Sequence, residues 1–486
     1  MQKIADVKYA SAVLQWDQEI YLPTKGANFR GQQLATLDEI AHELFTTEST
    51  GNLLNQLNNL PQLTIVEKSN VALSLEAYER QTKVSGSFVR QMSEAINNSY
   101  HAWAAAYKAN DFKLFEPALN KVVDFKKQEA DLIGYEVHPY NALMNDYDKG
   151  LTTTMVDLLF ENLMPALKIM LHKINASTQN SYAILKGHFN KDQQWKFGLD
   201  LLKQMGFDFE AGRQDISMHP FTTSFNSLDV RVTTRIDEQD FDNMTWSCLH
   251  EGGHALYEQG LPHDQYGLPL GEYCSLSIHE SQSRLWENNV GRGLSFWKYN
   301  MNLLQNYFPE AFGSVSVEAF YKAINVVQPS LIRTEADELT YHFHVMIRYE
   351  IEKALIDGSL KTKDIPELWN ALYKQYLGVD VPDDKRGCLQ DIHWSHGSFG
   401  YFATYSLGSL YAAQLFHTIE QAHPTLITEI EKGNFKTIND WLSNNIYPFG
   451  KQFPSAMLCE QATGEKLNAQ YFIQYIQKKY AALYSL

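Results

Sequence analysis

The stretch from His250 to His254 reads His-Glu-Gly-Gly-His and constrains the fold more than any other part of the chain. A spacing of four residues places two imidazoles one turn apart on one face of a helix, with the carboxylate of Glu251 beside them. Two such imidazoles are typical zinc ligands, and the carboxylate can reach a water on the same ion. The pattern therefore predicts a helix that holds a hydrolytic metal.

The residues around this motif predict a helix from about 242 to 259. Asp240 supplies a capping oxygen before the helix, and Gly260 follows its last periodic residue. The two adjacent glycines inside the motif should each cost about 0.8–1 kcal/mol relative to alanine. We therefore expect another backbone, or a substrate, to approach the helix closely at Gly252 and Gly253.

A catalytic zinc keeps three protein ligands and one open position, so a third ligand is expected downstream of the motif. A third histidine at metzincin spacing is excluded, because Gly260 occupies its place. The acidic candidates are Glu258, Glu272, Glu280 and Glu287. We choose Glu280, at the start of a second predicted helix. Ser277 and Glu280 also fit a capping box, and the spacing alone leaves both interpretations open.

Helical periodicity dominates the 486 residues, and no linker, repeat or shift in composition divides them. We expect a mostly α fold and a single domain over residues 1–486, with two lobes as a variant of that arrangement. Residues 227–234 alternate in polarity as a half-buried strand does. They predict a small antiparallel β-sheet beside the metal-binding helix.

Charge and cysteine content exclude several classes of protein. A net charge of −16 argues against a nucleic-acid or anionic-membrane surface. No signal peptide and no run of 18 apolar residues is recognised, so we expect a cytoplasmic protein. Four widely spaced cysteines predict buried thiols and no disulfide framework. They are Cys248, Cys274, Cys388 and Cys459.

A polar stripe runs through the segment 331–356, which predicts one long helix. The stripe consists of Arg333, Asp337, Tyr341, His344 and Arg348, at spacings of three or four residues. It fits a solvated face with an ordinary ion pair between Arg333 and Asp337. It equally suits a site for a carboxylate, because the guanidinium fork matches that group.

A second polar cluster occupies the segments 387–394 and 400–405. It concentrates histidine, aspartate, glutamine and tyrosine in a glycine-punctuated loop that leads into a helix. One interpretation is a buried hydrogen-bonded turn. The other is a set of donors for an oxyanion and for substrate backbone. The residues alone do not separate the two.

Taken together, these segments resemble the M32 family of metallocarboxypeptidases, the Taq carboxypeptidase type, almost from end to end. Six motifs of that family are matched in order: HPF by His219 to Phe221, DxRxT by Asp229 to Thr233, HExxH by His250 to His254, HES/GQ by His279 to Gln282, I/V-R-x-x-A-D by Ile332 to Asp337, and GxxQDxHW by Gly387 to Trp394. The resemblance implies a helical fold with a deep groove, one divalent metal per subunit, homodimerisation, and release of single residues from peptide C-termini.

The resemblance also implies roles for particular residues. His250, His254 and Glu280 become the metal ligands, with zinc as the first choice and cobalt or manganese as alternatives. Glu251 is expected to act as general base and then as general acid. Oxyanion donors are sought among His393, Tyr401 and Tyr405. For the substrate we rank Arg348 first, then Arg333, with Arg231, His219, Asp229 and Gln390 as further groove residues.

Two other functions share these features. One is a zincin oligopeptidase or aminopeptidase, which would use the same metal and the same base. The other is a non-enzymatic protein with a structural metal, against which Glu251 argues, since a structural site needs no base. Blocked peptides separate the enzymes: a C-terminal amide should defeat a carboxypeptidase, and an N-terminal acetyl group an aminopeptidase.

Overall fold

The computed structural model describes all residues from Met1 to Leu486 and contains 21 α-helices and three short strands. The fold is mostly α, as the sequence predicts. The residues group into two compact units, each assembled from three stretches of the chain. Unit 1 comprises residues 1–81, 181–324 and 411–467, and unit 2 comprises residues 82–180, 325–410 and 468–486. None of the helices has the length and hydropathy that a membrane span requires.

Unit 1 carries the sheet and the HExxH helix. Its elements are α1 (Gln2–Ile20), α2 (Ala27–Phe45), α3 (Glu48–Asn58), most of α4 (Ile65–Lys83), α9 (Lys191–Met205), β1 (Gly212–Ile216), β2 (Thr222–Asn226), β3 (Asp229–Thr234), α10 (Phe241–Gly260), α11 (Leu276–Arg284), the π-helical turn η6 (Leu285–Gly291), α12 (Leu294–Tyr307), α13 (Pro309–Phe312), α14 (Val317–Ala323), α18 (Leu426–Ile430), α19 (Lys436–Asn445) and α20 (Ser455–Thr463).

Unit 2 is helical. It contains α5 (Gly86–Ala109), α6 (Glu116–Ile133), α7 (Tyr140–Met144), α8 (Thr153–Asn175), α15 (Tyr341–Asp357), α16 (Ile365–Leu377) and α21 (Gln470–Tyr484). The helix α17 (Phe402–Ala422) begins in unit 2 and ends in unit 1.

The sheet of unit 1 is mixed, in the order β1-β3-β2. The predicted strand is β3. The predicted alternation is confirmed over residues 229–232, because Val230 and Val232 are buried while Asp229 and Arg231 are partly exposed, but it ends there, since Thr233 and Thr234 are buried as well. β2 and β3 form the expected antiparallel hairpin. β1 pairs with β3 in parallel, so the expectation of a wholly antiparallel sheet is wrong. The loop 217–221 connects β1 to β2 at opposite edges of the sheet, and β3 then fills the central position between them.

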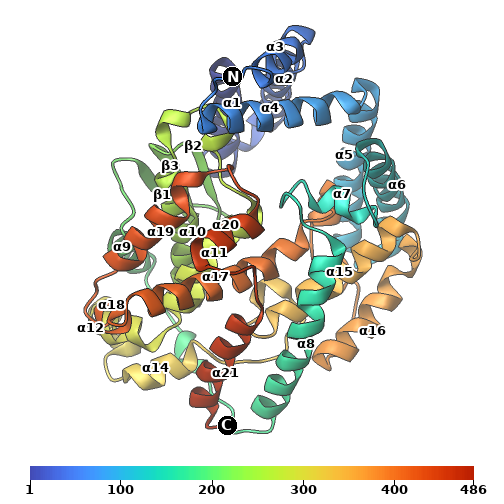
Figure 1. Cartoon of the computed structure of the whole chain (residues 1–486). Coiled ribbons are helices and arrows are strands. Elements are labelled where there is room, and N and C mark those ends of the chain that lie inside the picture. The colour runs from blue at the N-terminus through green and yellow to red at the C-terminus, as the bar shows by residue number, and fades with distance from the viewer. The chain divides into compact units, whose positions relative to one another are not determined.

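The helix α10 packs against β3, α9 and α11, and Figure 1 shows these elements together in the green and yellow part of the ribbon. Its first residue, Phe241, is fully buried and anchors the helix in an aromatic cluster. The ring centroids of Phe189, Phe308 and Phe312 lie 5.6, 5.7 and 5.0 Å from that of Phe241. This packing anchors the first turn of α10 and thereby fixes the positions of the residues one to three turns later.

The polar stripe of segment 331–356 does not lie on one helix. α15 begins only at Tyr341, and residues 333–335 form a separate 3₁₀ turn. The side chain of Asp337 accepts hydrogen bonds from the backbone amides of Leu339 and Thr340, at 2.9 Å each. Such local bonds compete with helix formation, so the helix starts later than periodicity predicts. Of the two interpretations of the stripe, the solvated face with an ion pair between Arg333 and Asp337 is therefore wrong.

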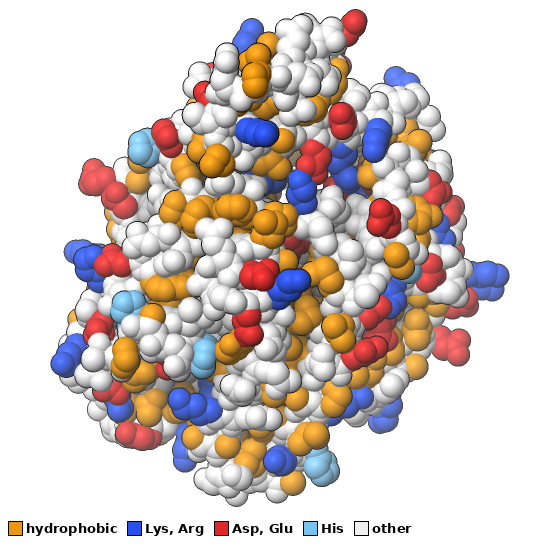
Figure 2. Space-filling model, viewed as in Figure 1, with side chains coloured by type: hydrophobic (Ala, Val, Ile, Leu, Met, Phe, Trp, Pro, Cys, Tyr) orange, Lys and Arg blue, Asp and Glu red, His pale blue; other side chains and the backbone are white.

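Acidic and basic side chains are interspersed over the face of the molecule that Figure 2 shows.

All four cysteines are buried and free, as predicted. Burial raises the pKa of the Cys248 and Cys459 thiols to about 12, which leaves them protonated and unreactive near neutral pH.

Candidate functional site

The helix α10 holds its two histidines in the predicted arrangement. It begins after the N-cap residue Asp240, whose side chain accepts a hydrogen bond from the backbone amide of Asp242 at 3.0 Å. The observed bounds, Phe241–Gly260, agree with the predicted helix to within one residue at each end. The imidazole centroids of His250 and His254 lie 4.9 Å apart, so both rings face the same side.

The helix α11 crosses α10 at Gly253. A methyl group at Gly253 would meet the carbonyl oxygen of Gln282 at 2.5 Å and the Cα of Ser283 at 2.7 Å. The predicted close approach of a second backbone is thus confirmed at this residue. At Gly252 the nearest atoms belong instead to side chains of α9, at 2.7 Å from Met205 and 2.8 Å from Leu202.

This crossing brings Glu280 to the two histidines. Ser275 is the N-cap of α11, because its side chain accepts the hydrogen bond from the Ile278 amide, so the capping-box interpretation of Ser277 is wrong. The Oε2 atom of Glu280 lies 3.7 Å from His250 Nε2 and 3.5 Å from His254 Nε2. The carboxylate therefore faces both imidazoles.

These three side chains fit a single metal ion. One ligand atom from each of His250, His254 and Glu280 lies within 4.8 Å of the others. Bonds of about 2.0–2.1 Å in a tetrahedron place ligand atoms about 3.3–3.4 Å apart, which is close to the separations of the two imidazoles from the carboxylate. Two nitrogens and one oxygen form the donor set of many hydrolytic zinc sites, and they leave a fourth position open.

Charged side chains surround the three candidate ligands. Glu287 Oε2 lies 2.9 Å from His250 Nδ1, and Arg284 Nε donates to Glu280 Oε1 at 2.7 Å. Burial alone would raise the pKa of Glu280, but the charges of Arg284 and His250 hold it well below its usual range. Burial and the neighbouring His279 lower the pKa of His254 to about 3, so its imidazole is neutral, the form that binds metal.

The other acidic candidates have different places. Glu258 accepts a hydrogen bond from His279 Nε2 at 2.8 Å and another from the Ser224 hydroxyl at 2.7 Å. His279 in turn stacks on His254, with centroids 4.3 Å apart. Glu272 forms an exposed ion pair with Lys451. The sequence analysis missed the contact of Glu287 with His250, although contact of a carboxylate with the second nitrogen of a metal-binding imidazole is a common arrangement. It also missed the stacking of His279 on His254.

The strand β3 carries two of the predicted groove residues. Asp229 accepts two hydrogen bonds from Arg231, from Nε and Nη2 at 2.9 Å each. The Arg231 guanidinium also lies 4.3 Å from the ring centroid of Trp16 and 4.8 Å from that of Phe225. Arg231 is thus held by one carboxylate and two rings, while His219 is exposed in the loop before β2.

In unit 2 the two predicted arginines share one carboxylate, that of Asp391. Arg333 approaches Asp391 Oδ1 through Nη2 at 2.9 Å, and Arg348 donates to Oδ2 through Nε at 2.6 Å. Although burial raises the pKa of Asp391, the two guanidinium groups hold it well below its usual range. Gln390 lies between them, since its Oε1 accepts from the Arg333 amide at 2.9 Å and from Arg348 Nη2 at 2.8 Å.

The two arginines differ in exposure. The Arg348 side chain is 0% exposed and also donates to the His344 carbonyl and to Tyr373, whereas the Arg333 side chain is 8% exposed. A ligand could therefore reach Arg333 more readily than Arg348. The sequence ranked these residues in the opposite order, because it gave no sign of which one the Asp391 network encloses.

The three predicted oxyanion donors lie together in unit 2. His393 Nε2 is 3.3 Å from the Tyr405 hydroxyl, and the rings of Tyr401 and Tyr405 are 4.9 Å apart. Burial, reinforced by the charge of Arg333, lowers the pKa of His393 to about 3. The imidazole is therefore neutral at physiological pH. It can donate a hydrogen bond but carries no charge.

Comparison with known proteins decides the family. Residues 1–480 match the family described as carboxypeptidase Taq (M32) metallopeptidase. The chain belongs to the M32 family of metallocarboxypeptidases. It is 38% identical to thermostable carboxypeptidase 1 of Thermus thermophilus, covering 97% of this chain and 95% of that protein. It is 36% identical to carboxypeptidase 1 of Bacillus subtilis, covering 100% and 97%.

Solved structures agree. The crystal structure of an M32 carboxypeptidase from Deinococcus radiodurans matches with a TM-score of 0.98 and 37% identity, over 100% of this chain and 98% of that one. The chain is thus a metallocarboxypeptidase, and the aminopeptidase and oligopeptidase alternatives are not favoured. Family membership implies a divalent metal, for which His250, His254 and Glu280 form a candidate site.

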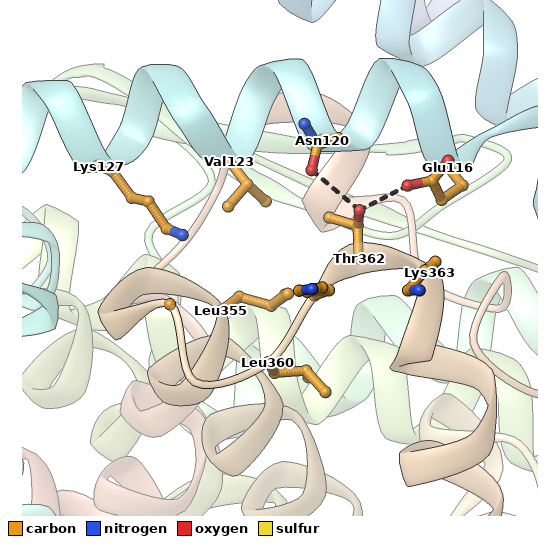
Figure 3. A pocket seen from close by; sticks show the side chains of 10 residues that line it. Glu116, Asn120, Val123, Lys127, Leu355, Leu360, Thr362 and Lys363 are labelled. Atoms are coloured by element: carbon orange, nitrogen blue, oxygen red, sulfur yellow. Dashed lines mark hydrogen bonds between the residues drawn. The ribbon is translucent and has the colours of Figure 1, made fainter.

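A pocket of about 210 Å³ in unit 2 contains none of the predicted site residues. Figure 3 shows it between α6 and the segment that follows α15. Thr362 Oγ1 lies 2.7 Å from Glu116 Oε1 and 3.1 Å from Asn120 Oδ1 on one side, and three lysines, Val123, two leucines and a glycine complete the lining. Its lining holds no histidine and none of the three candidate metal ligands, so it is not the candidate metal site.

Proposed function

We propose that this metallocarboxypeptidase removes single residues from the C-termini of peptides with one zinc ion bound by His250, His254 and Glu280. The observation that carries the proposal is the position of Glu280 Oε2, which faces the Nε2 atoms of both histidines. The N₂O donor set favours zinc, and cobalt or manganese would fit the same ligands. When bound, the ion lowers the pKa of a coordinated water towards neutrality.

Glu251 is the proposed general base. The residue is 7% exposed, and burial raises the pKa of its carboxyl group, which brings its basicity closer to that needed near neutral pH. Glu251 takes the proton of the attacking water and then passes it to the leaving amine. It lies one residue from His250 on α10, within the buried part of the helix.

Recognition of the terminal carboxylate is assigned to Arg333, with Arg348 as its support through Asp391. Partial exposure favours Arg333, since the Arg348 guanidinium is enclosed by protein acceptors. Arg231, His219 and Asp229 stay proposed groove residues, and Gln390 is proposed to hold the two arginines in place. His393, Tyr401 and Tyr405 are the proposed donors to the substrate carbonyl, with a neutral His393 acting through its N–H.

The function is tested with a mixed peptide pool, zinc-loaded protein and mass spectrometry. We expect a ladder of products shortened from the C-terminus, no cleavage of C-terminal amides, and normal cleavage of N-acetylated peptides. Chelation should abolish the ladder, and zinc should restore it. Cleavage of amides at the rate of free acids would overturn the carboxypeptidase assignment.

His254→Ala tests the ligand set in the same assay. We expect loss of stoichiometric metal and of activity together. Undiminished cleavage by a variant that has lost its metal would remove these residues from the proposed site. Homodimerisation is also proposed, and light scattering after size-exclusion chromatography should give twice the chain mass of 55.7 kDa. A cytoplasmic location stays a prediction that cell fractionation can test.

A further inference from the structure

Two motifs of the sequence, HPF at 219–221 and DxRxT at 229–233, converge on the proposed general base. Thr222 directly follows the first motif and is the first residue of β2. Its hydroxyl lies 2.7 Å from Glu251 Oε2 and 3.0 Å from the Glu251 carbonyl oxygen. Both neighbours are acceptors, so the hydroxyl is the donor. The shorter contact is to the carboxylate, where a charge-assisted hydrogen bond is strongest.

This hydroxyl is the hydrogen-bond donor that the structure gives the Glu251 carboxylate. A glutamate side chain has three rotatable bonds, and fixing them costs up to about 2 kcal/mol of conformational entropy. A donor on one oxygen restricts that freedom and leaves Oε1 for the reacting water. Misplacement of a reacting group by about 1 Å costs about 10²-fold in rate, so such restriction has a measurable effect.

The strand β2 presents the same face to α10 at its next alternate residue. Ser224 donates to Glu258 Oε2 at 2.7 Å, and residues 222 and 224 lie on one side of a strand. Two hydroxyls of one strand thus each hold a carboxylate of α10. The contact between Thr222 and Glu251 therefore belongs to the regular packing of β2 on α10 and is not an isolated encounter.

Thr233, the threonine of the second motif, fixes the backbone just before Thr222. Its Oγ1 accepts from the Phe221 amide at 2.9 Å, and its own amide donates to the Phe221 carbonyl at 2.9 Å. Ser217 Oγ lies 2.7 Å from Thr233 Oγ1 and 2.5 Å from the His219 carbonyl oxygen. Because Thr233 is 1% exposed, water does not compete for these bonds.

We propose that Thr222 is a positioning residue for Glu251, and that Thr233 holds Thr222 in place through the backbone of Phe221. The proposal rests on the proposed role of Glu251 and adds to it. The threonine of DxRxT thus supports the base. Asp229 and Arg231 of the same motif differ, since they pair with each other and Arg231 lies over the rings of Trp16 and Phe225.

The test compares Thr222→Val with Thr222→Ser in the zinc-loaded enzyme. Valine keeps the β-branched shape that a strand favours and replaces the hydroxyl by a methyl group. We expect kcat to fall about 10- to 100-fold in Thr222→Val with KM and metal content unchanged, and to stay within about threefold in Thr222→Ser. The matched control is Thr245→Val, since the Thr245 hydroxyl is buried on α10 without a hydrogen-bond partner. This control should keep full activity.

A double-mutant cycle shows whether Thr222 acts through Glu251. In a Glu251→Gln background, Thr222→Val should cause no further loss, because residues that act as a unit are strongly non-additive. An equal loss in both backgrounds, or an equal loss in Thr222→Ser and Thr222→Val, would refute the proposal. A kcat within twofold of wild type in folded Thr222→Val would refute it as well. Full activity of Glu251→Gln itself would instead refute the base assignment, so the two failures are distinguishable.

Discussion

Gly253→Ala should separate α11 from α10 and weaken metal binding. The new methyl would lie 2.5 Å from the Gln282 carbonyl oxygen, and ordinary van der Waals contact begins at 3.4 Å, so the α11 backbone would have to retreat by about 0.9 Å. Glu280 precedes Gln282 by two residues on α11. A shift of this size exceeds the tolerance of about 0.2 Å on metal–ligand distances. The Glu280 oxygen would then no longer match the positions of the two imidazoles.

The magnitude follows from two opposing effects. Overpacking costs about 1–3 kcal/mol, and replacing a helical glycine by alanine returns up to about 1 kcal/mol. We therefore expect Gly253→Ala to destabilise the apoprotein by about 0–2 kcal/mol. Displacement of Glu280 should lower zinc affinity by about 10- to 100-fold, as loss of a supporting residue does at other metal sites.

Gly252→Ala is the matched control. Its methyl would meet the ends of Met205 and Leu202, which are flexible side chains that can move, in place of a backbone. Zinc affinity by competition with a chromogenic chelator and unfolding in urea should be measured for both variants. We expect a large affinity difference between the two. Equal zinc affinity in Gly253→Ala, Gly252→Ala and the wild type would refute the argument that the α10–α11 crossing sets the ligand geometry.

Three further predictions, with four substitutions, test individual groups. Glu251→Gln should keep the metal and lose about 10²- to 10⁴-fold in kcat, and a loss below about tenfold with full metal content would remove Glu251 as the base. Arg333→Ala should reduce the preference for free acids over amides. Arg348→Ala should mainly destabilise the fold, by about 1–3 kcal/mol for each buried acceptor that loses its donor, such as the His344 carbonyl. The reverse pattern would show that the carboxylate is read by Arg348. Burial raises the pKa of Glu352 from 4.5 to about 7. The stability that its protonated form contributes is therefore present below pH 4.5 and is lost as the pH rises through 7. The free energy of unfolding should fall by at most about 3 kcal/mol over this range. Glu352→Gln should therefore lose less thermal stability than the wild type between pH 5 and pH 8, and parallel melting curves would contradict the assignment.

The sequence predicted the features of the site that depend on local spacing. His250 and His254 face one side because four residues make about one helical turn, and the cap at Asp240 is equally local. Glu280 could be identified as the third ligand only through the family resemblance, because its place beside the histidines depends on how two helices cross. The adjacent glycines carried the one local sign of that crossing, and the structure confirms it at Gly253.

Long-range pairings could not be read from periodicity. The sheet order depends on which strand fills the central position, and alternation in β3 is the same for parallel and antiparallel neighbours. The interpretation that paired Arg333 with Asp337 failed for a similar reason. The partner of Arg333 is Asp391, 58 residues further along the chain, while Asp337 is engaged by nearby amides.

The pairing of Arg333 and Arg348 with one Asp391 leaves a surplus of positive charge in a buried place. Two guanidinium groups face a single carboxylate, and the side chains of all three residues are less than 10% exposed. His344 and His393 add no charge, because burial and the arginines lower the pKa of both imidazoles. A buried charge without a counterion is costly, and a bound carboxylate would neutralise it. A balanced ion pair would have no such need for an added anion. We propose that a peptide's terminal carboxylate supplies it at Arg333, whose side chain is 8% exposed against 0% for Arg348.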